Sequence, residues 1–170
     1  MIRDLTARDH DLFLALCDEF YHSPAVAHPI PAAFYENTFQ ELMRSDVYAK
    51  CYILEHEGTP AGYALLSRSY SAEAGGPVVW IEELYLRPRF RCHGLGSEFF
   101  TFLEKHHPAA RYRLEIEPDN ERAARLYRSR GFEVLPYVQM IKDMNVMLQL
   151  QKHVIVHIQL PRCHSLMLNN

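Results

Sequence analysis

The stretch of sequence that decides the fold is residues 78–106, which read VVWIEELYLRPRFRCHGLGSEFFTFLEKH. Its first nine residues form an apolar run that is interrupted by Glu82 and Glu83 and followed by Pro88, which predicts a strand over 78–86. From Gly94 onward the apolar residues recur every three or four positions, which predicts a helix over 94–106. A strand that leads through a short turn into a helix is typical of layered α/β domains.

The turn between this strand and this helix, Arg91 to Ser97 (RCHGLGS), carries two glycines. Because glycine lacks a Cβ, another molecule can approach the main chain closely, and the free N–H groups at a helix start suit a phosphate. A dinucleotide fingerprint is excluded because Phe99 stands where a small residue is needed, and the Gly-Lys-Ser/Thr of a P-loop is absent. The turn therefore predicts a phosphate loop of another type, although a purely structural role for the glycines stays open.

A second motif lies at residues 120–132, which read NERAARLYRSRGF. Asn120 is a preferred residue at a helix start and Gly131 at a helix end, so a helix is predicted between them. Tyr127 lies two helical turns after Asn120, and we expect the two side chains to share a face.

Taken together, the R-x-x-G-x-G turn and the N-x-x-A-x-x-x-Y-x-x-x-G-F helix resemble the GCN5-related N-acetyltransferase (GNAT) superfamily. The resemblance covers residues 2–142, is specific at 78–132 and is absent after 143. It implies a GNAT-like fold and acetyl-CoA as the acyl-donor cosubstrate.

The resemblance also implies a role for each matching position. The turn would wrap the diphosphate of acetyl-CoA with backbone N–H groups, the strand before it would pair with the pantetheine arm, and Tyr127 would be the general acid near the sulfur. The implied cofactor-binding residues are Leu84, Tyr85, Leu86, Arg91, Cys92, His93, Gly94, Leu95, Gly96, Ser97, Asn120 and Tyr127. Cys92 and His93 stand where glycine and lysine are common in the family, so phosphate binding is still expected but a lysine's charge is missing.

The acidic pair Glu82 and Glu83 supplies the rest of the expected chemistry. An amine must lose a proton before it attacks a thioester, and a carboxylate can take that proton directly or through water. By its likeness to the acidic pair of polyamine-acetylating GNATs, Glu82 is expected to be the base and Glu83 a substrate-side charge. Strand alternation predicts that the two point to opposite faces.

The proton for the departing thiolate is expected from Tyr127, because tyrosine is protonated at neutral pH. A backbone N–H of the strand at 78–86 is expected to stabilise the oxyanion. Solvent-facing or ion-paired glutamates and a tyrosine that merely packs are the plainer alternatives.

The other predicted elements are strands at 2–5, 48–56, 61–69 and 112–117 and from Phe132 onward, and helices at 8–22 and 32–44. The full order is β-α-α-β-β-β-α-β-α-β-β, an α/β fold with a mixed, mostly antiparallel central sheet flanked by helices. Residues 1–143 are expected to form one N-acetyltransferase domain. Residues 144–170 contain no Asp or Glu and are expected to be a C-terminal extension, in which Val154 to Leu160 is either an edge strand or part of an appendage.

The composition and charge of the chain argue against a nucleic-acid-binding protein and a membrane-spanning protein. The net charge of −3 disfavours a nucleic-acid binder, and no apolar run approaches the roughly 20 residues that span a bilayer. The N-terminus lacks the pattern of a signal peptide, so we expect a cytoplasmic protein without nucleic-acid or membrane partners. The four cysteines are scattered, so neither a disulfide framework nor a metal site is predicted. The resemblance implies direct transfer of the acetyl group, so no covalent role is expected for Cys92.

The resemblance, together with the acidic pair, implies an N-acetyltransferase that moves an acetyl group from acetyl-CoA to a primary amine by direct attack in a ternary complex. The acidic pair weakly favours a small cationic amine as the acceptor. A protein lysine or N-terminal amine is one alternative, and a non-catalytic acyl-CoA sensor is another. A homodimer is compatible with the resemblance.

Overall fold

The computed structural model describes residues 1–26 and 29–142 of the chain. The elements are β1 (Ile2–Asp4), α1 (His10–Tyr21), α2 (Ala32–Arg44), β2 (Ala49–His56), β3 (Thr59–Ser71), β4 (Gly76–Leu86), α3 (Leu95–His106), β5 (Arg111–Leu114) and α4 (Glu121–Ser129), with short 3-10 helices η1 (Ala7–Asp9) and η2 (Pro88–Phe90). By its contacts the chain divides after Glu133, and the described residues beyond it, 134–142, contain no helix or strand. Within the described ranges, no helix has the length and apolar character needed to cross a membrane.

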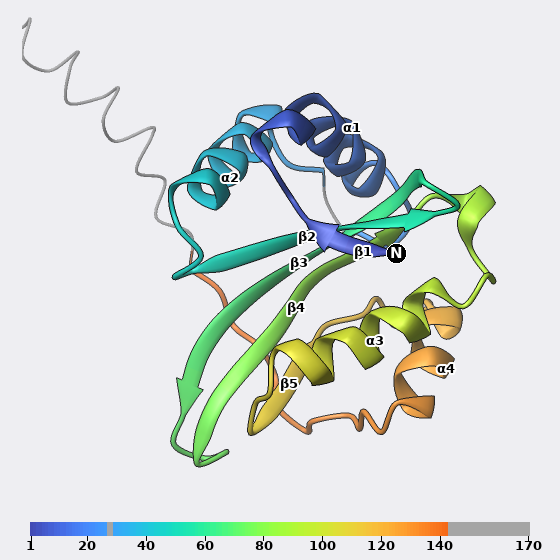
Figure 1. The fold of residues 1–170 in the computed structure, drawn as a ribbon. Helices are drawn as coiled ribbons and strands as arrows, with labels where there is room; N and C mark the ends of the chain where they lie inside the picture. Colours follow the sequence, from blue (N-terminus) through green and yellow to red (C-terminus); the bar gives the residue numbers. More distant parts are fainter. Residues whose placement is uncertain (27–28, 143–170) are drawn as a thin grey trace, which may run out of the picture. The chain divides into compact units, whose positions relative to one another are not determined.

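The strands form one five-stranded sheet in the order β1-β2-β3-β4-β5. All neighbouring strands are antiparallel except β4 and β5, which are parallel. Helices α1 and α2 cover one face of the sheet, and α3 and α4 lie on the other (Figure 1). The predicted α/β class with a mixed, mostly antiparallel sheet is therefore confirmed.

Two apolar layers hold the helices to the sheet, because successive strand residues point to opposite faces. On the α1–α2 face, Phe13 and Leu16 of α1 pack against Tyr63 of β3, and all three are fully buried. On the α3–α4 face, Phe99 and Leu103 of α3 are likewise fully buried in a second cluster. Each face of the sheet thus carries its own core, and β3 and β4 run between the two.

Strand β4 contains a β-bulge at Glu82. Leu65 of β3 lies opposite Glu83, but the next residue, Leu66, lies opposite Ile81, so Glu82 has no partner of its own. The extra residue interrupts the alternation of side chains along β4. This bulge decides where the acidic pair points, as described below.

Three sequence predictions need correction. The strand expected at 112–117 ends at Leu114, because β4 leaves it there. The helix expected at 8–22 begins as the 3-10 turn η1 and becomes α-helical at His10. The strand expected from Phe132 onward does not form in the described residues 132–142, where Pro136 lacks the N–H that a strand ladder needs. The segment Val154 to Leu160 lies outside the described residues.

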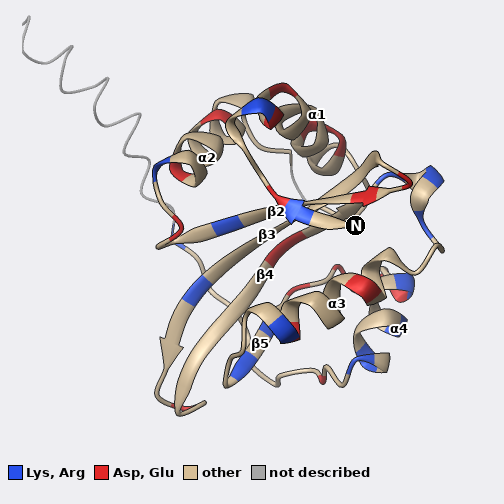
Figure 2. Ribbon diagram, in the orientation of Figure 1, with Lys and Arg blue, Asp and Glu red and all other residues tan. Residues whose placement is uncertain are grey.

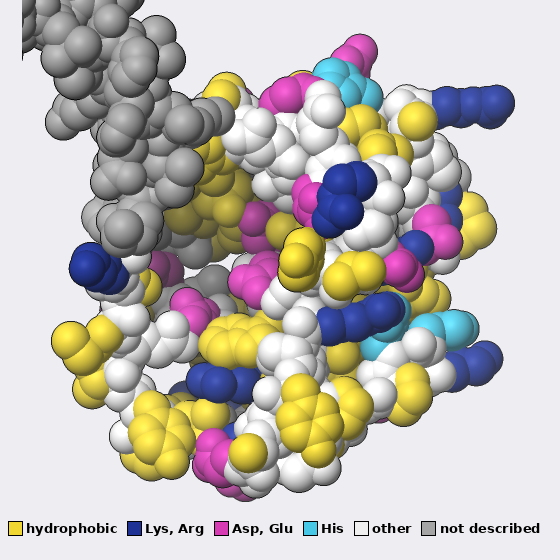
Figure 3. Space-filling model, turned by 90° about the vertical axis from the view of Figure 1, so that its left-hand side faces the viewer, with side chains coloured by type: hydrophobic (Ala, Val, Ile, Leu, Met, Phe, Trp, Pro, Cys, Tyr) yellow, Lys and Arg dark blue, Asp and Glu magenta, His cyan; other side chains and the backbone are white. Residues whose placement is uncertain are grey.

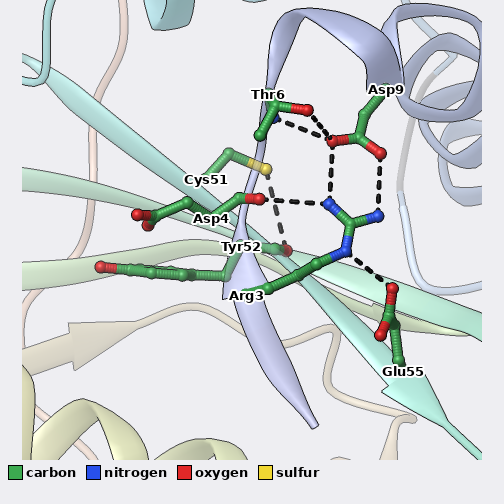
Figure 4. Close-up of polar contacts among 7 residues, drawn as sticks. All are labelled: Arg3, Asp4, Thr6, Asp9, Cys51, Tyr52 and Glu55. Carbon is green, nitrogen blue, oxygen red and sulfur yellow. Dashed lines mark hydrogen bonds and ion pairs between the residues drawn. The ribbon is translucent and has the colours of Figure 1, made fainter. Parts of the chain in front are cut away.

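A partly buried polar network joins β1, η1 and β2 through Arg3 (Figure 4). The guanidinium donates two hydrogen bonds of 2.8 Å to the Asp9 carboxylate and one of 2.7 Å to Oε1 of Glu55. The backbone N–H and hydroxyl of Thr6 also donate to Asp9, at 2.9 and 2.7 Å. The network therefore fixes the start of the chain to the edge of the sheet.

Because of this network, the free energy of unfolding is expected to depend on pH. The hydrogen bonds from Arg3 lower the pKa of Asp9 to about 2 against the opposing effect of burial, whereas an unfolded aspartate has a pKa of about 4. The stabilisation is complete above about pH 4 and is lost as the pH falls toward about 2. Asp9→Asn is expected to lower the free energy of unfolding by about 2 kcal/mol at pH 7, and by much less at pH 2.5.

Urea titrations at both pH values measure this difference. Asp46→Asn is the matched control, because Asp46 is exposed and forms no ion pair within the described part of the chain. If the difference in the free energy of unfolding between Asp9→Asn and wild type were the same at pH 7 and pH 2.5, the lowered pKa of Asp9 would not be its cause.

Candidate active site

The centre of the site is the point where β4 and β5 diverge. The two strands pair only from Val78 opposite Arg111 to Ile81 opposite Leu114. Beyond Ile81, β4 continues to Leu86 with β3 as its one strand neighbour in the described sheet. Alternate main-chain N–H and C=O groups of residues 82–86 therefore face an edge that no strand occupies. The predicted pantetheine-binding segment, Leu84 to Leu86, lies on this edge.

The N-terminus of α3 lies beyond the end of β4. Gly94 precedes the helix with a left-handed φ of 82°, and the first helical hydrogen bond runs from Glu98 N to Gly94 O at 3.0 Å. The N–H groups of Leu95, Gly96 and Ser97 precede this bond and have no partner inside the helix. Together with the helix dipole they suit an anion, so the turn at 91–97 fits a diphosphate.

Helix α4 places Asn120 and Tyr127. The side-chain oxygen of Asn120 accepts a hydrogen bond of 3.2 Å from Ala123 N and so caps the helix. The ring of Tyr127 packs edge-on against Phe100, with ring centres 5.7 Å apart, on the α3–α4 face of the sheet. Burial raises the pKa of Tyr127 to about 12. Its hydroxyl is therefore protonated, and it has no hydrogen-bond partner within residues 1–26 and 29–142.

Glu83 is buried among tyrosines on the α1–α2 face. The hydroxyl of Tyr21 donates to its Oε1 at 2.5 Å, and that of Tyr63 donates to its Oε2. Tyr21 in turn stacks on Tyr35 of α2, with ring centres 5.4 Å apart. Burial raises the pKa of Glu83, and the two hydroxyls oppose that rise. Both carboxylate oxygens are thus bonded, and α1 is joined to β4.

Glu82 is exposed on the same face. Its carboxylate accepts a hydrogen bond from the hydroxyl of Ser67, a residue that alternation places on the face of Tyr63 and Leu65. The prediction that the acidic pair points to opposite faces is therefore wrong. The bulge turns both carboxylates toward the α1–α2 side, and β4 carries acidic residues at its middle in Figure 2.

Several contacts around this pair join residues that lie far apart in the sequence. Tyr21 and Tyr63 are 62 and 20 positions from Glu83, and Arg87 forms an ion pair of 2.7 Å with Glu19, 68 positions away. Such contacts between distant positions have no local pattern. The aromatic residues early in the chain were the one available signal for Tyr21 and Tyr35.

The face in Figure 3 shows acidic side chains near its middle, with hydrophobic, Lys and Arg side chains around them. The ring of Trp80 lies on β4 two residues before Glu82, with the guanidinium carbon of Arg113 4.2 Å from its centre. Within the described ranges, no group of three or more His, Cys, Asp or Glu residues could hold a metal ion.

The arrangement offers a proton acceptor and a proton donor on the two sides of one open strand edge. Glu82 lies on the α1–α2 face, and Tyr127 packs on the α3–α4 face in the same apolar cluster as Leu84 and Leu86. Residues 82–86 have no strand neighbour on the side of β5. An extended thioester that binds beside β4 would lie near main-chain N–H donors, the carboxylate of Glu82 and the phenol of Tyr127. The described residues fit an acyl-CoA.

Comparison with known proteins agrees with this geometry. A family model described as the acetyltransferase (GNAT) family matches residues 11–132, and no curated protein sequence matches. A possible acetyltransferase from Clostridium difficile 630 is similar in structure, with a TM-score of 0.71 and 15% identity, over 85% of this chain and 97% of that one.

Two structures of the aminoglycoside N-acetyltransferase AAC(6')-Iy are similar as well. The complex with the bisubstrate analogue CoA-S-monomethyl-acetylneamine has a TM-score of 0.68 and 17% identity, over 85% of this chain and 97% of that one. The complex with CoA has a TM-score of 0.67 and 17% identity, over 84% and 93%. At such identities the likeness concerns the fold, whereas the family model covers most of the chain. The chain therefore belongs to the GNAT family and is an acetyl-CoA-dependent acetyltransferase.

Proposed function

We propose that this protein N-acetylates a primary amine by direct attack on acetyl-CoA within a ternary complex, and that the preferred acceptor is a small cationic amine. The observation that carries the proposal is the divergence of β4 from β5 after Ile81, with Glu82 on one face of the sheet and Tyr127 packed on the other.

The cosubstrate side rests on main-chain groups. The edge of β4 at Leu84 to Leu86, which no strand of the described sheet occupies, would bind the pantetheine arm, and the N–H groups at the start of α3 would bind the diphosphate. The amide of Asn120 keeps its –NH2 group available, because its oxygen caps α4. An N–H of the bulged segment would stabilise the oxyanion of the attacked carbonyl.

The acceptor side rests on the acidic pair. Glu82 is exposed and would take the proton from the amine. Glu83, which is buried between Tyr21 and Tyr63, would add a second negative charge on the acceptor side. Two carboxylates on one face attract a cation, which favours a small cationic amine over a neutral one.

The experiment is a thiol-release assay with acetyl-CoA and a panel of amines: a linear polyamine, an amino sugar, a lysine peptide and a peptide with a free N-terminus. Glu82→Gln is expected to lower turnover by about 100-fold, the scale of a lost general base, while CoA affinity measured by calorimetry stays unchanged. The first two amines are expected to react fastest.

Glu104→Gln is the matched control, because Glu104 is an exposed glutamate on α3, away from the acidic pair. Equal turnover of Glu82→Gln and wild type would remove Glu82 from the mechanism. Faster reaction of either peptide than of the polyamine and amino sugar would instead overturn the proposed acceptor class.

A further inference from the structure

The turn at 91–97 supplies little free positive charge of its own. The Nε group of Arg91 donates to the carbonyl oxygen of Leu86 at 2.8 Å, so this guanidinium is turned back onto the end of β4. A ring nitrogen of His93 lies 2.9 Å from the carbonyl oxygen of Arg91. A diphosphate at the start of α3 would thus meet amide hydrogens, while the one arginine of the turn is held to the end of β4 through its Nε group.

Helix α4 packs against the first turn of α3 and brings an arginine to this place. Leu126 lies so close to Gly96 that a Cβ on that glycine would be 2.8 Å from the leucine Cδ2. Arg122 precedes Leu126 by four residues and therefore lies on the same side of α4, one turn nearer the helix start. Its Nη2 atom donates to the sulfur of Cys92, the second residue of the turn, at 3.2 Å.

This guanidinium is available to a stronger partner. A thiol sulfur is a weak hydrogen-bond acceptor, whereas a phosphate oxygen is a strong one for arginine. Arg122 is exposed and forms no ion pair within the described residues, and the nearby Glu121 pairs instead with Arg125 at 3.5 Å. Arginines also mark α4 in Figure 2. Arg130, by contrast, is engaged with the carbonyl oxygen of Ser97 at 2.9 Å.

We propose that Arg122 binds the diphosphate of acetyl-CoA and supplies the charge that the side chains of the turn do not. The inference rests on the proposed function only for the place of the diphosphate. On binding, the guanidinium exchanges the Cys92 sulfur for phosphate oxygens, and no covalent bond forms or breaks.

Calorimetric titration of CoA into purified protein tests the proposal, with Arg122→Gln compared with Arg128→Gln. Arg128 is an exposed arginine on the same helix but on another side of it, so both variants lose one charge. Arg122→Gln is expected to weaken CoA binding by about 10-fold or more, the scale of a lost hydrogen bond between charged groups, with a smaller dependence on salt. Arg128→Gln is expected to bind as the wild type does.

Dephospho-CoA, which lacks the 3′-phosphate, identifies the phosphate involved. The loss of affinity in Arg122→Gln is expected to be the same for dephospho-CoA as for CoA. If the loss disappears with dephospho-CoA, or if Arg122→Gln binds CoA as tightly as wild type, the assignment is overturned while the proposed function stands. Absence of CoA binding by the wild type would overturn both.

Discussion

Gly62→Ala is expected to lower the thermal stability of the protein strongly. Gly62 lies on β3 opposite Leu86, and a Cβ at this position would be 1.9 Å from the carbonyl oxygen of Tyr85 and 2.9 Å from the Cα of Leu86. These are main-chain atoms, so the clash is relieved only if β4 moves away from β3 and their hydrogen bonds break. Overpacking of this kind costs about 3 kcal/mol or more, a large part of the 5–15 kcal/mol that stabilises a typical domain.

Soluble yield and thermal unfolding followed by circular dichroism measure the effect. Gly75→Ala is the control, because a Cβ there meets no atom within 4 Å and only the left-handed φ of 68° opposes the substitution. That strain costs about 1–2 kcal/mol. Any folded Gly62→Ala is also expected to bind CoA poorly, because the displaced segment is the open edge of β4. If Gly62→Ala melted at the same temperature as Gly75→Ala, β3 and β4 would not be as close at Gly62 as described.

Tyr127→Phe is expected to lower turnover by about 100- to 1,000-fold, the scale of a lost general acid. The affinity for CoA is expected to stay the same. The ring keeps its contact with Phe100, so the substitution removes one hydroxyl and little packing. Because burial raises the pKa of Tyr127 to about 12, the hydroxyl carries its proton throughout the neutral range. The wild-type rate is therefore not expected to fall through ionisation of this residue below about pH 11.

The measurement is single-turnover thiol release, which separates the chemical step from product release. Tyr70→Phe is the matched control, because Tyr70 is 74% exposed near the end of β3. Equal single-turnover rates for Tyr127→Phe and Tyr70→Phe would leave Tyr127 with a packing role alone. A loss of CoA affinity in proportion to the loss of rate would point to a binding role instead.

Local patterns predicted most of the fold. The α2 range of 32–44 and the strands around the turn at 57–58 follow from periodicity and turn residues, and the structure has them nearly where expected. The motif residues of the turn at 91–97 and of α4 were likewise readable, because a helix start and a glycine turn are encoded by neighbouring residues.

The sequence could not predict features that depend on strand register or on distant partners. The alternation rule misplaced Glu82 and Glu83 because a bulge is visible only when β3 and β4 are aligned. The contact between Tyr21 and Glu83 joins positions 62 residues apart, and that between Arg122 and Cys92 joins positions 30 apart. The end of β5 at Leu114 likewise reflects where its neighbour leaves it, not its own residues.

The extra residue in β4 makes this part of the enzyme sensitive to chain length. Deletion of either Glu82 or Glu83 would restore a regular ladder and leave a single acid opposite Leu65 on the α1–α2 face, so the pair of carboxylates would be lost. Conservative exchanges within the acidic pair keep the spacing, whereas a one-codon deletion destroys it. Sequence alignments of this segment should therefore give gaps more weight than mismatches.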